Sequence, residues 1–234
     1  MKPGTVFLIP APLYDDALNA LPAHILPAIQ QCHAFFVENE KTTRRYFKQI
    51  WKEMVIDDYA WFTIHKAEES VITAFKKILL EGKNIGIVSE AGCPGIADPG
   101  QILTGIAQQM QVTVHPLVGP NAILLALMAS GMNGQRFAFE GYLPIDTAER
   151  KNKIKTLEQI SRQQNSTQIF IETPYRNQAL LLDIIQVCKE NTLLCIGVDI
   201  TAPSENIYTK TIGEWKKTTL PLHKRPAVFL LLAN

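Results

Sequence analysis

The chain has 234 residues, of which 47% are hydrophobic and 19% charged, the balance of a folded globular protein rather than a disordered one. Its net charge of +1 gives no general argument for nucleic-acid binding, although a local basic face is compatible with it. The four cysteines form no Cys-x-x-Cys pair and the histidines have no zinc spacing, so the sequence predicts reduced thiols, no metal site and a cytoplasmic location.

The sequence predicts neither a secretory signal at its start nor a membrane span. The first residues lead straight into an apolar strand, without the long apolar region and cleavage site of a secretory signal. The longest apolar stretch, residues 122–132, is shorter than the about 20 residues that a membrane span requires. We therefore expect neither secretion nor membrane insertion.

The first half of the chain alternates short β-branched runs with longer amphipathic ones, which is typical of βα units around a largely parallel sheet. The predicted strands are residues 5–10, 34–37, 85–89 and 112–115. Apolar residues that recur at spacings of three and four predict helices over residues 16–31, 42–51, 67–81 and 101–109.

The pattern changes near residue 120. A long apolar helix is predicted over residues 121–130, with Asn121 as its N-cap. Further strands are predicted at 136–140, 168–172, 193–199 and 227–232, and further helices at 147–163 and 176–190. The second half is thus richer in sheet and more mixed in strand direction. We expect an N-terminal α/β domain over 1–117, a C-terminal α/β domain over 118–234, and a ligand site in the cleft between them, because ligand sites favour domain interfaces.

Residues 88–100, VSEAGCPGIADPG, carry the strongest local signal. They follow a predicted strand, which places them at the carboxyl end of the sheet, where open α/β folds bind ligands. Three glycines and two prolines make a preset loop whose backbone can approach a ligand closely. The segment is not G-x-G-x-x-G and lacks a lysine for phosphate, so a dinucleotide or P-loop site fits poorly. A structural βα turn is the alternative, but it needs less glycine and proline.

Three later segments also join strands to polar turns. The Gly119-Pro120 turn presents backbone N–H groups at a helix start, which suits an anionic or polar ligand group, although it equally fits an interdomain turn. Residues 169–176, IFIETPYR, form a strand that ends in polar residues, and Glu172 taken alone could merely cap the next helix. In residues 224–227, KRPA, Pro226 fixes the entry into the last strand.

The motifs SEAGCPGIADPG, PLVGPNAILLALMASG, QRFAFEGYLP and FIETPYRN, in this order and spacing, closely resemble the bacterial 16S ribosomal RNA (ribose-2'-O) methyltransferases of the tetrapyrrole-methylase superfamily. The resemblance covers nearly the whole chain. It implies a two-lobed α/β fold with an N-terminal mostly parallel sheet and a C-terminal mixed sheet, each flanked by helices. It also implies a homodimer, with a folded S-adenosylmethionine held in the cleft between the lobes.

Carried over by position, the resemblance implies a set of cofactor-binding residues. They are Pro10, Ser89, Glu90, Ala91, Gly92, Cys93, Pro94, Ile96, Gly119, Pro120, Asn121, Ala122, Glu172, Thr173, Pro226 and Ala227.

The sequence departs from the family pattern at three places. The first loop reads APLYDD (residues 11–16) instead of a Thr-Pro-Ile-Gly-Asn-like run, and residues 38–41 read ENEK instead of Glu-Asp-Thr-Arg. The chain also ends after its last predicted strand, without the small C-terminal domain that such enzymes often carry. The first two departures fall on loops expected to face the substrate. The candidate substrate-binding residues are Tyr14, Lys41, Arg44, Tyr175 and Arg176.

Methyl transfer from a sulfonium to a ribose hydroxyl requires alignment of the two groups, which can lower the activation barrier by about 7–11 kcal/mol. It also requires removal of the hydroxyl proton, and a positioned base accelerates the reaction by roughly 10²–10⁴-fold. The candidate bases are Glu38, Glu90 and Glu172, each at the end of a predicted strand. Each is equally interpretable as a helix cap or a cofactor contact.

The predicted helix over residues 147–163 carries five basic residues, Arg150, Lys151, Lys153, Lys155 and Arg162. They are interpretable as a face that follows RNA phosphates, or as an ordinary charged surface with pairs such as Lys155 and Glu158.

Three functions therefore remain open. The leading one is a methyltransferase that uses S-adenosylmethionine to methylate a ribose of small-subunit ribosomal RNA, with ribosomal RNA or the small subunit as partner. The second is methylation of a tetrapyrrole or another small molecule, which the near-neutral charge favours. The third is a non-catalytic module that binds S-adenosylmethionine.

Overall fold

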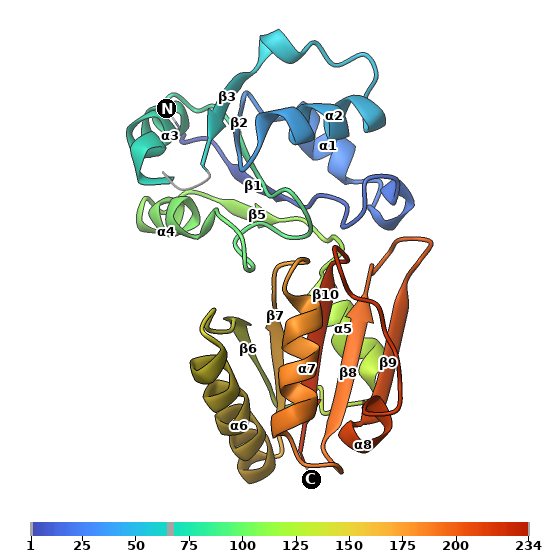
Figure 1. The fold of residues 1–234 in the computed structure, drawn as a ribbon. Helices are drawn as coiled ribbons and strands as arrows, with labels where there is room; N and C mark the ends of the chain where they lie inside the picture. Colours follow the sequence, from blue (N-terminus) through green and yellow to red (C-terminus); the bar gives the residue numbers. More distant parts are fainter. Residues whose placement is uncertain (1, 65–67, 234) are drawn as a thin grey trace. The chain divides into compact units, whose positions relative to one another are not determined.

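The computed structural model describes residues 2–64 and 68–233. The chain divides into two compact units, Met1–Asn121 and Ala122–Asn234. Figure 1 shows both units, and each is described below by itself.

The first unit is built on a parallel sheet of five strands in the order β3-β2-β4-β1-β5. The strands are β1 (Val6–Ile9), β2 (Ala34–Val37), β3 (Ala60–Thr63), β4 (Ile85–Val88) and β5 (Val114–Pro116). Since the strands are parallel, their carboxyl ends all lie at one edge of the sheet. This edge receives the loops that follow β1, β2 and β4.

Helices cover both faces of this sheet. They are α1 (Ile25–Gln30), α2 (Glu40–Ile50), α3 (Ile72–Leu80) and α4 (Gln101–Gln109), with short 3-10 turns at Leu18–Ala20, Ile56–Asp58 and Glu68–Val71. Neighbouring residues of β2 point to opposite faces: Phe35 packs in one buried cluster with Phe47, and Phe36 packs in another with Phe75. The first unit therefore has two apolar layers, one on each face.

The second unit contains a mixed sheet in the order β6-β7-β10-β8-β9, in which β6 and β7 are parallel and the other neighbours are antiparallel. Its strands are β6 (Phe137–Tyr142), β7 (Thr167–Ile171), β8 (Leu193–Val198), β9 (Asn206–Thr211) and β10 (Ala227–Leu232). Its helices are α5 (Ala122–Ser130), α6 (Thr147–Gln164), α7 (Asn177–Val187) and α8 (Ile212–Trp215). In Figure 1, α6 and α7 lie in front of the sheet and α5 lies behind it.

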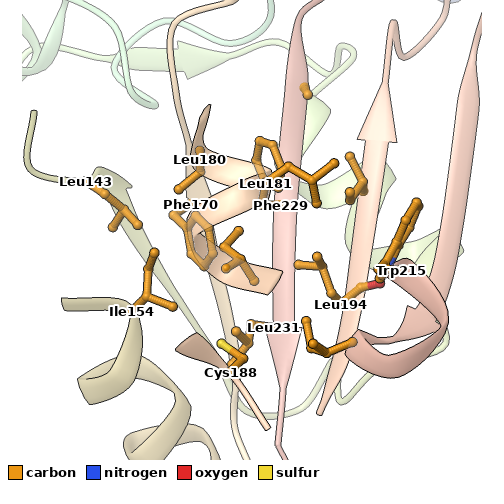
Figure 2. Packing of buried hydrophobic residues seen from close by; sticks show 14 of the residues in the cluster. Leu143, Ile154, Phe170, Leu180, Leu181, Cys188, Leu194, Trp215, Phe229 and Leu231 are labelled. Carbon is orange, nitrogen blue, oxygen red and sulfur yellow. The ribbon is translucent and has the colours of Figure 1, made fainter. Parts of the chain in front are cut away.

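The main core of the second unit fills the space between the sheet and helices α6, α7 and α8. Figure 2 shows this cluster, in which the Phe170 and Phe229 rings of adjacent strands lie parallel with centroids 6.0 Å apart. Trp215 is buried as well, and its indole N–H donates to the Leu194 carbonyl at 2.8 Å. The aromatic side chains thus tie β7, β8, β10 and α8 together.

The fold confirms the predicted α/β class, with a parallel first sheet and a mixed second one. The helix predicted over residues 16–31 is wrong in extent: only Ile25–Gln30 is α-helical, because Pro22 interrupts the segment and Pro27 is tolerated in the first turn of the shorter helix. Strands β3 and β9 were not predicted. Of the helix predicted over 67–81, Ala67 lies outside the described residues.

The described residues contain neither a helix suited to span a membrane nor a cluster of metal-binding side chains. None of their helices combines the length and apolar character that a bilayer span requires. In the same part of the chain, no three His, Cys, Asp or Glu side chains are grouped so as to hold a metal ion.

Candidate functional site

The loop between β4 and α4, residues 89–100, has glycines at positions where the backbone adopts a positive φ. Gly92 and Gly95 both have φ of +76°, and Gly100 has φ of +118°, a region that favours glycine because it has no Cβ. Ala97 has φ of +65°, which is uncommon for a residue with a side chain. The loop is therefore held in one unusual path at the carboxyl end of β4.

Hydrogen bonds fix this loop to the loop that follows β1. Gly92 and Ala11 exchange two backbone hydrogen bonds, at 2.9 and 3.0 Å. The buried Ser89 hydroxyl donates to the Gly92 carbonyl at 3.1 Å. These hydrogen bonds fix the backbone conformation of the two loops.

The Gly119-Pro120 turn lies beside the same loops. A Cβ at Gly119 would stand 2.2 Å from Cγ of Pro10, so the backbone approaches that proline as closely as only glycine allows. The Cys93 thiol lies 3.5 Å from the Pro120 carbonyl, and burial raises the pKa of this thiol above its ordinary value. The structure therefore brings together Pro10, Ser89 to Cys93 and Gly119-Pro120, as the cofactor prediction requires within the first unit.

Three carboxylates gather at the carboxyl edge of the first sheet. The Glu90 backbone N–H donates to Glu38 at 3.2 Å, and the Thr42 hydroxyl donates to the Glu90 carboxylate at 3.1 Å. Burial raises the pKa of the third carboxyl, Asp98, to about 7, with a further contribution from the negative charges of Glu38 and Glu90. Sequence reasoning missed Asp98. Its signal was an acid within the same glycine- and proline-rich loop.

Two neighbouring arginines of α2 have different surroundings. Arg44 pairs with Glu40 at 2.8 Å and lies over the Trp61 ring, 4.9 Å from its centroid. Arg45 pairs with Asp15 at 2.7 Å, in the loop that departs from the family pattern. The other predicted substrate residues of this unit, Tyr14 and Lys41, are exposed. The structure does not gather these residues around one point.

In the second unit, a buried polar group lies where β7 ends. The Glu172 side chain is fully buried and pairs with Arg176 at 2.6 Å. The Asn177 side-chain amide donates to the Arg225 carbonyl at 2.6 Å. Three buried atoms of this group have no hydrogen-bond partner: Oε2 of Glu172, Nε of Arg176 and Oδ1 of Asn177. Buried polar atoms rarely stay unpaired, so this group is incomplete by itself.

The segment before β10 is fastened to the same group. The Lys224 backbone N–H donates to the Pro174 carbonyl at 3.0 Å, and Arg225 pairs with Asp199 at 2.8 Å. Because β10 is antiparallel to β7, its start at Ala227 lies at the sheet edge where β7 ends. The structure thus brings Glu172, Thr173, Pro226 and Ala227 to one edge of the second sheet. The Tyr175 side chain is exposed there.

Helix α6 does not present its basic residues as one face. Arg150 is buried and pairs with Asp183 at 2.6 Å, and Lys153 pairs with Glu140 at 2.8 Å. Lys151 also lies 3.4 Å from Asp183. The predicted pair of Lys155 with Glu158 is wrong, because Glu158 is buried and accepts hydrogen bonds from the Lys189 backbone and the Thr192 hydroxyl.

Comparison with known proteins identifies the family of the chain. No family model matches the chain. A ribosomal RNA small subunit methyltransferase I of Buchnera aphidicola is 29% identical over 234 residues, covering 99% of this chain and 79% of the relative. The protein of the same name from Vibrio cholerae is 30% identical over 212 residues, covering 89% and 69%. The chain belongs to the ribosomal RNA small subunit methyltransferase I family.

Solved structures place this family member among tetrapyrrole-methylase folds, as the resemblance predicted. Diphthine synthase aligns with a TM-score of 0.68 at 13% identity, over 98% of this chain and 90% of that one. The methyltransferase CobJ aligns with a TM-score of 0.64 at 15% identity, over 100% and 95%. The uroporphyrin-III C-methyltransferase of Thermus thermophilus, solved with S-adenosylhomocysteine, gives 0.56 at 12% identity, over 98% and 97%. At these identities the likeness concerns the fold.

Proposed function

We propose that this chain is an S-adenosylmethionine-dependent methyltransferase that methylates a ribose 2'-hydroxyl of small-subunit ribosomal RNA in the cytoplasm, as a homodimer. Its relatives of 29% and 30% identity carry the name of small-subunit methyltransferases. The observation that carries the proposal is the gathering of the predicted cofactor residues, around Gly92 and Gly119 in the first unit and around Glu172 in the second.

The chemistry of these residues fits S-adenosylmethionine. The cofactor supplies a methyl group on a sulfonium, which makes it ready for displacement. Its hydroxyl and amino groups need acceptors, and Glu172 Oε2 and Asn177 Oδ1 are buried acceptors without a partner. In the first unit, the glycine loop around Gly92 offers backbone that a ligand can approach closely. The domain limits at 117 and 118, and the contact of one cofactor with both units, stay predictions.

The acceptor hydroxyl must lose its proton as it attacks, so a base is required. Of the three predicted bases, Glu172 is fully buried and paired with Arg176, which suits binding better than proton transfer. We propose Asp98 as the base, because a carboxyl with a pKa of about 7 is poised for proton transfer at neutral pH. Glu38 and Glu90 then act on Asp98 through their negative charges.

Calorimetric titration with S-adenosylmethionine and S-adenosylhomocysteine tests the cofactor site. We expect micromolar binding to the wild-type protein. Cys93→Arg, which adds bulk beside Pro120, and Glu172→Gln, which keeps the shape but removes the charge, should each weaken it at least tenfold. Gly105→Ala, on the surface of α4, is the control. If the wild-type protein binds neither compound, the methyltransferase proposal is wrong.

A second candidate function is methylation of a tetrapyrrole or another small molecule. The near-neutral net charge and the ion pairs that occupy Arg150, Lys151 and Lys153 favour it. Transfer of labelled methyl groups to small ribosomal subunits and to tetrapyrroles, measured side by side, separates the two. Binding of RNA should also weaken steeply with salt, because phosphate contacts release counterions. Binding without transfer to either acceptor would indicate a non-catalytic module.

A further inference from the structure

A small hollow lies beside the carboxylates of the first unit, and only Ser89 and Glu90 of its lining residues were predicted to belong to a functional site. Its walls come from the loop after β1, from α2 and from the end of β4. Pro12 and Asp15 line one side, Thr42 and Arg45 another, and Glu90 a third. It opens at the carboxyl edge of a parallel sheet, where α/β folds bind ligands.

The base of this hollow is rigid. Tyr46 is buried, and its hydroxyl donates to the Pro10 carbonyl at 3.0 Å, which ties α2 to the end of β1. Glu90 is held from two sides, since its N–H donates to Glu38 and its carboxylate accepts from Thr42. A ligand here would meet a preset wall, which reduces the entropic cost of binding.

The rim of the hollow carries an exposed ion pair whose two side chains can separate at little energetic cost. Arg45 and Asp15 form it at 2.7 Å, with 55% and 71% of their side chains exposed. An exposed ion pair contributes only about 0–1 kcal/mol. A guanidinium binds a phosphate through two parallel hydrogen bonds, which are stronger and more specific. Arg45 can therefore leave Asp15 for a phosphate at little cost.

Arg44, one residue earlier, is in a different position. Its guanidinium is engaged by Glu40 and by the face of Trp61, and it does not line the hollow. The sequence analysis named Arg44, and not Arg45, among the candidate substrate-binding residues. The structure favours Arg45.

We propose that this hollow receives a single phosphate group of the target RNA, with Arg45 as its phosphate ligand and Asp15 as an anion that competes for Arg45. The inference rests on the proposed function and names the part of the site that receives the RNA. It makes the ion pair between Asp15, in the loop that departs from the family pattern, and Arg45, in α2, a determinant of substrate affinity.

Steady-state methyl transfer to small ribosomal subunits tests this subsite. Arg45→Gln should raise the KM for subunits about tenfold with kcat within about twofold, because one charged hydrogen-bonding group is lost from binding. Arg44→Gln removes the same charge from the same helix and should change KM by less than about twofold. Asp15→Asn should lower KM about threefold, since it removes the competing anion.

A binding measurement gives a readout that does not depend on turnover. The protein saturated with S-adenosylhomocysteine is titrated with a fluorescent single-stranded oligoribonucleotide at several salt concentrations. Arg45→Gln should reduce the slope of log K against log salt by about 0.7, the value for one phosphate contact on a single strand. A poorly folded variant would lose affinity for S-adenosylhomocysteine. A smaller salt slope at unchanged affinity for S-adenosylhomocysteine therefore indicates a lost phosphate contact.

The outcomes separate the subsite from the proposed function. If the wild-type protein methylates subunits and Arg45→Gln keeps the wild-type KM and salt slope, the subsite is wrong and the function stands. If Arg44→Gln alone weakens binding, the phosphate ligand is Arg44 and the subsite is again wrong. If the wild-type protein transfers no methyl group to subunits, the proposed function fails and the subsite falls with it.

Discussion

The Glu172 carboxylate and the Arg176 guanidinium lie 2.6 Å apart across the turn between β7 and α7, and the carboxylate is buried completely whereas the arginine is about one-third exposed. One oxygen of Glu172 accepts from Arg176 and from the Thr173 backbone, and the other has no partner. A buried charge with one neutralising partner depends strongly on it. The pair is therefore sensitive to substitution on either side.

Arg176→Ala should lower the free energy of unfolding by about 2 kcal/mol, because it leaves the buried Glu172 charge unpaired, while partial exposure of the arginine reduces the loss. Urea denaturation measures the change. Arg176→Lys, which keeps the charge, should recover part of the stability. Equal midpoints for the wild-type protein and Arg176→Ala would show that the pair contributes nothing.

The basic residues of α6 should contribute unequally to stability. Arg150 is buried with Asp183, so Arg150→Ala should cost about 3–5 kcal/mol. Lys155 is exposed on the same helix, so Lys155→Ala should change stability by less than about 0.5 kcal/mol. Thermal and urea unfolding of the two variants make the comparison. Similar losses in both would contradict the buried ion pair.

The close approach at Gly119 predicts a local steric penalty. Gly119→Ala would place a Cβ 2.2 Å from Pro10 and should destabilise the protein by about 1–3 kcal/mol. Gly105→Ala meets nothing within 4 Å and lies within α4, so it should stabilise the protein by about 0.5–1 kcal/mol. Differential scanning calorimetry distinguishes the opposite signs. A neutral Gly119→Ala would mean that Pro10 moves aside freely.

Asp98 predicts a dependence of stability on pH. Burial, followed by the charges of Glu38 and Glu90, raises its pKa to about 7 in the folded chain, so the folded state holds this proton more tightly than the unfolded state. The stability linked to this proton is complete below about pH 4 and is lost as the pH rises through about 7. Between these values, the wild-type protein should lose more stability than Asp98→Asn. Parallel curves for the two proteins would contradict the raised pKa.

The same carboxyl predicts a pH profile for methyl transfer. If Asp98 accepts the proton, kcat rises with pH through an apparent pKa near 7 as the carboxylate forms. Asp98→Asn should lower kcat by roughly 10²–10⁴-fold and abolish this rise. Its affinity for S-adenosylhomocysteine should change little by comparison. An unchanged profile in the variant would assign the base elsewhere.

The strands and helices with strong local patterns could be predicted from the sequence. Strands β2 and β10 and helix α4 have the predicted limits, because their apolar runs are bounded by clear turns. Strand β3 consists of only four residues at the sheet edge, and β9, NIYTKT, alternates polar residues at the other sheet's edge. As an edge strand, β9 carries little apolar sequence, so its pattern was weak.

The candidate site was predictable where it depends on motifs and unpredictable where it depends on tertiary neighbours. The glycine loop at Gly92 and the Glu172 strand end are visible as sequence motifs. The raised pKa of Asp98 results first from burial, then from Glu38 in another loop and from Glu90 in its own loop, and the choice between Arg44 and Arg45 depends on Trp61 and Asp15. Glu38, Trp61 and Asp15 are all distant in sequence from the residue that each affects, so local motifs do not reveal these contacts.

The position of β10 has a consequence for synthesis of the chain. This strand lies in the middle of the second sheet, and β7 and β8 meet only through it. All strands of the first sheet precede residue 117, so that sheet can assemble while translation continues, as domains generally do from the N-terminal side. The second sheet must wait until residue 232 has emerged. Until then, two half-sheets, β6–β7 and β8–β9, present open edges that would attract chaperones or one another.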